Sequence, residues 1–315
     1  MLYRRLGGSG LKVSEISLGS WLTYGGYVEK QGAIDTIRKA YELGVNFYDT
    51  ANVYMRGEAE KVVGEALRGY ARESYVLATK VWGPMGDGPN DRGLSRKHIV
   101  EQCDASLRRL GLDYIDLYYC HSIDPDTPIE ETLRAMDDLV RQGKVLYVGV
   151  SNWTAAMMAE AAHIADRRLL DRIVASQPPY SMLKRDIERD VIPVGAKYGI
   201  GQVVYSPLAQ GVLSGKYKPG AEVPKDSRAG SERGGQAIQR YLTADNLERV
   251  ERLRRIADGL GLTLSQLALA WVLREPNVSS AIIGASRPEQ VEENAKASGV
   301  AIPADALEAI EAALQ

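Results

Sequence analysis

Cysteine is scarce in this chain of 315 residues, and so are long apolar runs and any excess of charge of one sign. Its two cysteines, Cys103 and Cys120, are too few for a scaffold built on disulfides. With 39 Lys and Arg against 41 Asp and Glu, the net charge of −2 argues against a nucleic-acid-binding protein and against a polybasic membrane-surface protein. No apolar run reaches the roughly 20 residues that span a bilayer. Polar, glycine-rich sequence follows Leu6, so we expect no signal peptide. These absences predict a cytoplasmic enzyme with reduced thiols and with neither nucleic-acid nor membrane partners.

What is present is an alternation of short apolar runs with amphipathic segments. The expected strands are 16–19, 45–48, 75–80, 114–119, 145–150, 173–176, 202–205 and 278–283. The expected helices are 31–43, 58–69, 96–110, 128–141, 154–168, 186–198, 263–274, 288–297 and, beyond the repeats, 303–313. About eight strand–helix units in roughly 300 residues predict an α/β fold, the (β/α)8 TIM barrel, with additional helices. No linker divides the chain, so we expect a single domain over residues 1–315.

Two segments lie outside these repeats. Residues 3–16 carry Gly7-Gly8-Ser9-Gly10 in their middle and predict a β-hairpin, which we expect to close the bottom of the barrel. Residues 208–240 are longer than an ordinary connection, and loops of that length are usually functional.

Polar residues follow the expected strands. In barrels of this kind the active site lies at the carboxyl ends of the strands. Asp49, Lys80 and His121 stand at the ends of three successive strands, and Tyr54 follows Asp49 in the same loop. A buried ammonium requires a partner, so we expect Lys80 to pair with Asp49.

Several motifs in order resemble the aldo-keto reductase family over essentially the whole chain. They are Gly44 to Ala51 with Tyr54, Ala78-Thr79-Lys80, Tyr119-Cys120-His121, Gly149 to Asn152, Ser206-Pro207-Leu208, and Gly284 to Asn294. Three more are similar to the branch that holds potassium-channel β subunits and their bacterial relatives. These are Gly19-Ser20-Trp21 with Gly25-Gly26, Arg92 to Lys97, and Gly211 to Tyr217.

The resemblance implies that Asp49, Tyr54, Lys80 and His121 are catalytic. It implies a reversible, NADPH-dependent reduction of aldehydes or ketones to alcohols, with the proton coming from Tyr54. A phenol has an ordinary pKa of about 10. A nearby ammonium favours the phenolate, so we expect Lys80 to lower the pKa of Tyr54, with Asp49 holding Lys80 charged. We expect His121 to hydrogen-bond the substrate oxygen.

The resemblance also implies NADPH or NADP+ as the cofactor. The residues expected around the nicotinamide are Ser20, Trp21, Asp49, Ser151, Asn152, Gln177 and Tyr205. Those expected along the pyrophosphate are Ser206, Pro207, Leu208, Gly211 and Lys216. Those expected at the adenosine end are Arg228, Gly284, Ser286, Gln290, Glu293 and Asn294. Arg and Ser donors bind a 2′-phosphate, so Arg228, Ser286 and Arg287 favour NADPH over NADH.

The expected walls of the substrate pocket are Trp21, Tyr24, Tyr54, Trp82 and His121. The chain lacks the long C-terminal loop that narrows the pocket in steroid-handling members, so we expect broad specificity. Small aldehydes, sugars such as glyceraldehyde and α-dicarbonyls such as methylglyoxal are the expected substrates. No metal is expected, because the neighbouring Cys120 and His121 point to opposite faces of a strand.

Two other functions stay open. The first is an NADP(H)-sensing regulatory subunit with little turnover, like the channel-associated relatives. Those relatives depart from the catalytic pattern at the histidine position, whereas this chain keeps His121, which favours an enzyme. The second is an aldolase or isomerase that uses Lys80 as a Schiff-base amine, a chemistry with no need for Ser151, Asn152 or Gln177. Homo-oligomers occur in this branch, and no sequence feature decides the oligomeric state.

Overall fold

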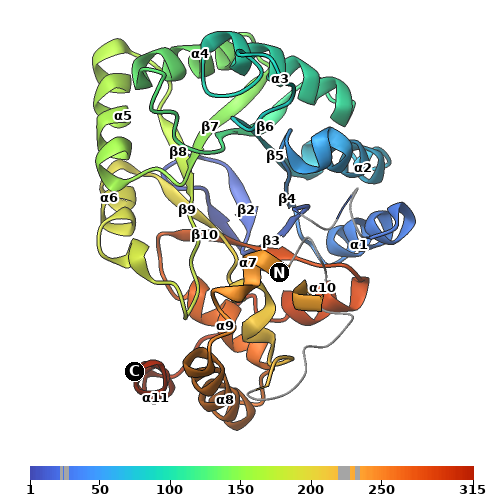
Figure 1. Cartoon of the computed structure of the whole chain (residues 1–315), viewed down its shortest axis with the longest axis vertical. Helices are drawn as coiled ribbons and strands as arrows, with labels where there is room; N and C mark the ends of the chain where they lie inside the picture. Colours follow the sequence, from blue (N-terminus) through green and yellow to red (C-terminus); the bar gives the residue numbers. More distant parts are fainter. Residues whose placement is uncertain (22–23, 25–27, 219–227, 231–234) are drawn as a thin grey trace.

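A closed barrel of parallel strands forms the centre of the protein in the computed structural model, which describes residues 1–315 except 22–23, 25–27, 219–227 and 231–234 (Figure 1). Neighbouring strands pair in the order β10-β3-β4-β5-β6-β7-β8-β9. The barrel strands are β3 (Ile16–Gly19), β4 (Phe47–Asp49), β5 (Val76–Val81), β6 (Ile115–Cys120), β7 (Val145–Ser151), β8 (Ile173–Gln177), β9 (Gly201–Tyr205) and β10 (Val278–Gly284). The predicted TIM barrel is confirmed.

Helices alternate with these strands and encircle them (Figure 1). The helices of the repeats are α1 (Lys30–Glu42), α2 (Glu58–Leu67), α3 (Arg96–Leu110), α4 (Ile129–Arg141), α5 (Ala155–Arg168), α6 (Val191–Tyr198), α9 (Leu264–Leu273) and α10 (Pro288–Ala295). The single helix expected over 186–198 is instead the 3-10 turn Asp186–Glu188 followed by α6. Proline is tolerated only in the first turn of a helix, so Pro193 requires α6 to begin close before it.

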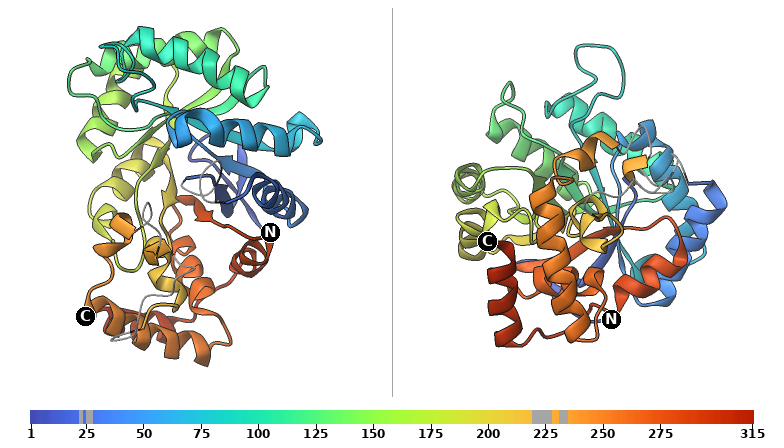
Figure 2. Two further views of the ribbon diagram at one scale, coloured as in Figure 1. Left: turned by 45° about the vertical axis from the view of Figure 1, so that its right-hand side comes forward. Right: turned by 60° about the horizontal axis from the view of Figure 1, so that its bottom comes forward.

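Additional helices lie outside the repeats. They are α7 (Gly235–Gln239), α8 (Ala244–Gly259) and α11 (Ala304–Leu314), and α8 and α11 lie side by side at the outer edge of the molecule (Figures 1 and 2). The other 3-10 turns are η2 (Tyr54–Gly57), η3 (Arg72–Ser74), η5 (Ala209–Ser214) and η6 (Arg228–Gly230). Among the described residues, no single helix is long and apolar enough to cross a membrane. One pair in the described ranges, α8 and α9, meets that length and composition when taken together, and its two helices are bent by 90°.

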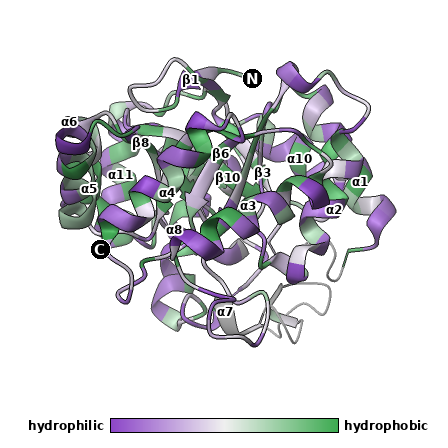
Figure 3. Ribbon diagram, turned by 90° about the horizontal axis from the view of Figure 1, so that it is seen from above, coloured by the Kyte–Doolittle hydropathy of each residue, from purple (hydrophilic) through white to green (hydrophobic). Residues whose placement is uncertain are grey.

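The N-terminal residues form the predicted hairpin, and it closes the bottom of the barrel. β1 (Tyr3–Arg5) pairs antiparallel with β2 (Lys12–Ser14). Leu6 and Val13 are fully buried in the cluster that fills the inside of the barrel. The Gly8 amide donates to the Gly199 carbonyl at 2.7 Å, just before β9 begins. The hairpin and α7 therefore lie at opposite ends of the barrel axis (Figure 3).

Alternation along the strands places the polar side chains. In β4, the apolar Phe47 at the bottom shares its face with Asp49 at the top, and in β5 Ala78 shares its face with Lys80. The inner apolar cluster thus fills the lower layers and leaves the charged residues at the carboxyl end. Asp49 and Lys80 therefore lie above a packed apolar core, because the interior of such a barrel is filled with side chains and is not a channel.

The hairpin plug generates a stability prediction. Leu6→Ala removes a fully buried side chain from the floor, and we expect it to lower the free energy of unfolding by about 2–5 kcal/mol in urea titrations. The control is Leu2→Ala, because Leu2 is 54% exposed just before the same hairpin; we expect a change below about 0.5 kcal/mol. Equal effects of the two substitutions would show that the hairpin does not close the barrel.

Candidate active site

Asp49, Tyr54, Lys80 and His121 converge at the carboxyl end of the barrel. Lys80 Nζ donates to Asp49 Oδ1 at 2.5 Å and to the Thr50 carbonyl at 2.7 Å. The Tyr54 hydroxyl lies 3.4 Å from Lys80 Nζ and 3.4 Å from His121 Nε2. Lys80 is fully buried and Asp49 is 3% exposed. The structure thus brings together all four residues that the sequence predicted to act together.

Neighbouring strands and one turn deliver these four groups. Asp49 pairs in register with Ala78, and Lys80 with Tyr119, so β4, β5 and β6 end at the same rim. His121 follows β6 directly, and its amide donates to the Val81 carbonyl at 2.9 Å. Tyr54 opens η2, which directly precedes α2.

Burial sets the protonation states of the site. It raises the pKa of Tyr54 well above its ordinary value, and the negative charge of Asp49 acts in the same direction. Burial lowers the pKa of Lys80. The negative charge of Asp49 acts in the opposite direction and partly offsets this effect. In the resting site burial therefore outweighs any lowering of the Tyr54 pKa by Lys80. The Lys80 ammonium is paired with Asp49, whose opposite charge offsets its effect on the phenol. Burial, with the charge of Lys80, lowers the pKa of His121 to about 3, so its imidazole is neutral near pH 7.

A chain of hydrogen bonds extends from Asp49 around the rim. Gln177 Nε2 donates to Asp49 Oδ2 at 2.8 Å, and Ser151 Oγ donates to the Gln177 carbonyl at 2.8 Å. Asn152 Nδ2 donates to Ser151 Oγ at 3.0 Å, and the Tyr205 hydroxyl donates to Asn152 Oδ1 at 3.0 Å. Residues expected around a nicotinamide are therefore connected to the Lys80–Asp49 ion pair.

Ser20 gives one test of whether this rim suits a polar ligand. Its amide donates to the Asp49 carbonyl at 2.9 Å, which fixes it beside the site. Its hydroxyl is buried and has no hydrogen-bond partner within the described part of the chain. A buried, unsatisfied hydroxyl is costly, so a ligand with a polar edge would suit this position.

The loop after β9 has an unusual backbone. Ser206, Ala209, Gln210 and Gly211 have φ values of 55°, 46°, 60° and 99°. Gln210, which the sequence did not single out, donates from Nε2 to Ser206 Oγ at 2.6 Å. A Cβ on Gly211 would lie 3.8 Å from Lys216 Cε, so the loop backbone and a cationic side chain lie close together. Pro207 and Leu208 lie within this loop. A phosphate group would suit such a combination of left-handed backbone and positive charge.

The residues predicted at the adenosine end lie around the start of α10, with one exception. The Ser286 amide and hydroxyl both donate to Gln290 Oε1, at 2.8 Å and 3.2 Å. Asn294 is buried and Glu293 exposed, and Gly284 ends β10. Arg287 is exposed at the N-cap of α10 and makes no ion pair within the described ranges. Arg228 is the exception: its backbone begins η6, and its side chain lies outside what the structure describes.

The predicted pocket aromatics occupy different environments. Trp21 is 39% exposed beyond the end of β3, and Trp82 is partly buried directly after β5. Tyr24 is buried in the hydrophobic cluster between barrel and helices, so its ring does not face open space. The role of Trp21 and Trp82 as pocket walls stays a prediction, whereas Tyr24 packs in the hydrophobic core.

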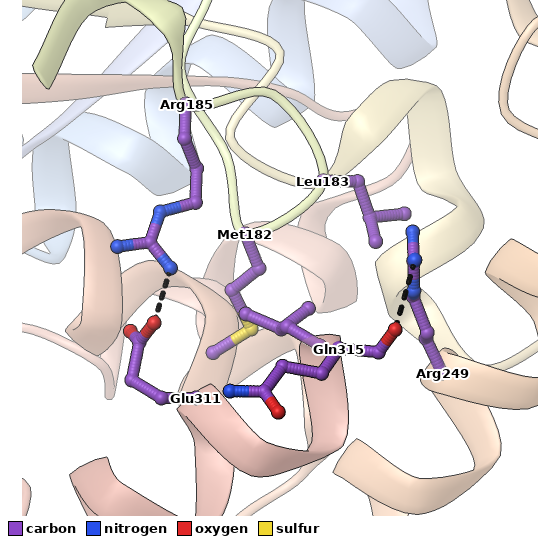
Figure 4. A pocket seen from close by; sticks show the side chains of 7 residues that line it. Met182, Leu183, Arg185, Arg249, Glu311 and Gln315 are labelled. Atoms are coloured by element: carbon purple, nitrogen blue, oxygen red, sulfur yellow. Dashed lines mark hydrogen bonds and ion pairs between the residues drawn. The ribbon is translucent and has the colours of Figure 1, made fainter. Parts of the chain in front are cut away.

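Other features of the described residues are not part of this group of side chains. A hollow of about 320 Å³ is lined by none of the predicted site residues (Figure 4); its lining is Met182, Leu183, Arg185, Arg249, Glu311, Leu314 and Gln315. No cluster of His, Cys, Asp and Glu in the described part of the chain suits a metal ion. Cys103 and Cys120 are buried free thiols, and burial raises the pKa of both.

The sequence also matches known proteins over nearly its full length. The model of the Aldo/keto reductase family matches residues 15–315. A probable voltage-gated potassium channel subunit beta of Arabidopsis thaliana is 47% identical over 304 residues, covering 95% of this chain and 92% of the relative. A protein of the same description from Oryza sativa subsp. japonica is 43% identical over 321 residues, covering 100% and 97%. A putative voltage-gated potassium channel subunit beta of Schizosaccharomyces pombe is 45% identical over 304 residues, covering 94% and 87%.

The low pKa of His121 generates a prediction on pH. In the unfolded chain this histidine titrates near 6.5, and in the folded protein at about 3. Between these values the unfolded chain binds more protons there, so stability falls as the pH drops through this range. We measure the free energy of unfolding in urea at pH values of about 7 and 5. We expect it to fall less between them in His121→Asn than in the wild type. Parallel stability curves for the two proteins would contradict a neutral, buried imidazole.

Proposed function

Since the chain belongs to the aldo/keto reductase family, we propose that it catalyses the reversible, NADPH-dependent reduction of aldehydes and ketones to alcohols. The observation that carries the proposal is the Tyr54 hydroxyl, which lies 3.4 Å from both Lys80 Nζ and His121 Nε2. When bound, NADPH supplies the hydride that the carbonyl carbon requires. The residues of the chain orient the substrate and give a proton to its carbonyl oxygen.

Tyr54 is the proton donor in this proposal. Burial keeps the phenol protonated, and its hydroxyl gives a proton to the carbonyl oxygen as negative charge develops there. The phenolate left behind lies beside Lys80, which Asp49 holds charged despite its burial. Lys80 therefore stabilises the state in which the proton has left rather than the resting phenol. Stabilising the phenolate lowers the activation barrier for proton transfer, and it does so without a low pKa of Tyr54 in the resting site.

His121 orients the substrate. Its imidazole is neutral near pH 7, so one ring nitrogen carries a hydrogen that can be donated to the carbonyl oxygen. The Tyr54 and His121 rings are arranged edge-on with centroids 5.4 Å apart, and the Tyr54 hydroxyl lies 3.4 Å from His121 Nε2, so one carbonyl oxygen could meet both groups. Two donors directed at one oxygen favour the negative charge that forms there.

The cofactor is proposed to lie along the rim from β7 to α10. Gln177, Ser151 and Asn152 offer amide and hydroxyl groups to the nicotinamide carboxamide, and the Tyr205 ring offers a stacking surface. The loop 206–216 with Lys216 would hold the pyrophosphate. Ser286 and Arg287 at the start of α10 would hold the 2′-phosphate, which favours NADPH over NADH.

The contacts of Lys80 weigh against the Schiff-base alternative. An amine nucleophile needs a free lone pair, so it must be deprotonated. The Nζ of Lys80 donates to a carboxylate and to a backbone carbonyl, and a phenol oxygen lies at 3.4 Å. These acceptors favour an ammonium, and a covalent role would require breaking the buried pair with Asp49.

A second function is favoured by the names of the similar proteins, which are described as channel β subunits. In that case the chain would bind NADP(H) and pass its redox state to a partner with little turnover. The two functions differ in one measurement, the rate of NADPH consumption with methylglyoxal or a nitrobenzaldehyde. Tight NADPH binding without consumption favours the sensor.

Tyr54→Phe tests the reductase. Losing the proton donor should lower turnover by about 10²–10⁴-fold, read as the loss of NADPH absorbance. NADPH affinity, read by tryptophan quenching, should stay within about twofold, because the hydroxyl acts on the substrate. The matched control is Tyr48→Phe, which removes a buried hydroxyl that donates to the Val45 carbonyl away from the site; its turnover should equal that of the wild type. Full activity of Tyr54→Phe would exclude the proposed role.

Arg287→Ala tests the choice of cofactor. Removing one charge-assisted contact to a 2′-phosphate should raise the Kd for NADPH about tenfold. The Kd for NADH, which lacks that phosphate, should change little. Equal weakening of both cofactors would mean that Arg287 does not contact the 2′-phosphate.

A further inference from the structure

The turn that carries Tyr54 has a backbone that its own sequence does not favour. Met55, Arg56 and Gly57 follow the tyrosine with φ values of 49°, 53° and 93°. Side chains other than glycine rarely adopt this left-handed region, and a run of them persists only where the surroundings hold it. The position of the Tyr54 hydroxyl therefore depends on whatever restrains this turn.

Arg109 of α3 lies directly on that turn. A Cβ added to Gly57 would stand 2.5 Å from Arg109 Cδ and 2.7 Å from Arg109 Nε. Only a glycine leaves room for this side chain to cross the backbone at the end of η2. Arg109 also donates from Nη2 to Ser106 Oγ at 3.1 Å, which fixes its guanidinium on α3.

A buried carboxylate holds Arg109 in this place. Glu60 in the first turns of α2 is fully buried, and its Oε2 accepts from Arg109 Nε at 2.5 Å. Its Oε1 accepts from Thr79 Oγ1 at 2.6 Å. Thr79 precedes Lys80 in β5, so one carboxylate joins the helix after the Tyr54 turn to the strand that carries Lys80.

We propose that the Arg109–Glu60 pair is a positioning device that sets the distance from the Tyr54 hydroxyl to Lys80 Nζ and His121 Nε2. Arg109 holds the turn from outside, and Glu60 ties Arg109 to the strand of Lys80. Neither residue contacts the reacting atoms; both act through Tyr54. The effect on turnover rests on the proposed reductase function, whereas the effect on the position of Tyr54 does not.

A second pair in the same barrel serves as the matched control. Arg72 Nη2 and Asp116 Oδ2 lie 2.5 Å apart, and Asp116 Oδ2 also accepts from the Leu77 amide at 2.8 Å. The side chains of Arg72 and Arg109 are 21% and 17% exposed, and each carboxylate partner bonds to β5. The Asp116 contact is made at the bottom of the barrel, whereas the Glu60 contact is made next to Lys80.

The experiment compares Arg109→Met, Arg109→Lys and Arg72→Met with the wild type. Displacing a reacting group by about 1 Å can cost on the order of 10²-fold in rate, so we expect Arg109→Met to lower kcat about 10- to 100-fold. The KM and the Kd for NADPH should stay within about twofold. Proton transfer from a displaced Tyr54 should limit the rate more strongly, so the solvent deuterium isotope effect on kcat should rise. Arg109→Lys can still pair with Glu60 and should recover part of the loss. Arg72→Met should lower Tm and leave kcat and the isotope effect unchanged.

A readout without turnover separates this inference from the proposed function. In ring-labelled protein, the Tyr54 NMR resonance is assigned with Tyr54→Phe; it should shift in Arg109→Met and not in Arg72→Met. If the wild type consumes no NADPH, the reductase proposal fails while the resonance still decides the positioning role. An unmoved Tyr54 resonance in folded Arg109→Met, or an equal fall in kcat in Arg72→Met, overturns the inference. If Arg109→Met does not fold, Arg109→Lys, which keeps a cation beside Glu60, takes its place; it should shift the Tyr54 resonance, and an unmoved resonance there would overturn the inference.

Discussion

The buried ion pair between Lys80 and Asp49 is the interaction on which the site depends. Removing two charges from water carries a large desolvation free energy. Their attraction offsets it only where the geometry is good and further hydrogen bonds satisfy both groups. Here Asp49 also accepts from Gln177, and Lys80 also donates to the Thr50 carbonyl. The pair therefore orders its neighbours: Gln177 connects it to Ser151 at the rim, and Lys80 faces the Tyr54 hydroxyl.

The barrel stabilises this ion pair because its closed, apolar floor excludes water. Inner side chains of the lower layers are apolar, and the hairpin adds Leu6 and Val13 to them. Water is kept from the lower side of the pair, and the low dielectric strengthens every interaction at the rim. The same dryness raises the pKa of Tyr54 and lowers that of His121, which leaves both groups neutral and able to donate hydrogen bonds.

The sequence predicted the barrel, the hairpin and the meeting of Asp49, Tyr54, Lys80 and His121, because polar residues after apolar runs mark the ends of strands. It did not foresee that burial raises the pKa of Tyr54, because burial depends on the packed fold rather than on residue types. Glu60 and Arg109 escaped notice because they stand 49 positions apart, each in a helix where charge is ordinary. The role of the Thr50 carbonyl as an acceptor for Lys80 could not be predicted, since every residue has a backbone carbonyl.

The hairpin also determines when the barrel is finished. Arg4 donates to the Val278 carbonyl, 274 positions later, and Gly7 to Ser279 Oγ, 272 positions later. The hairpin is therefore held by β10, the barrel strand that comes last in the chain. Until that strand is complete, the apolar interior stays open at its base, and contacts of such sequence separation form slowly. Partly folded chains that lack this strand pairing expose apolar surface, which favours aggregation.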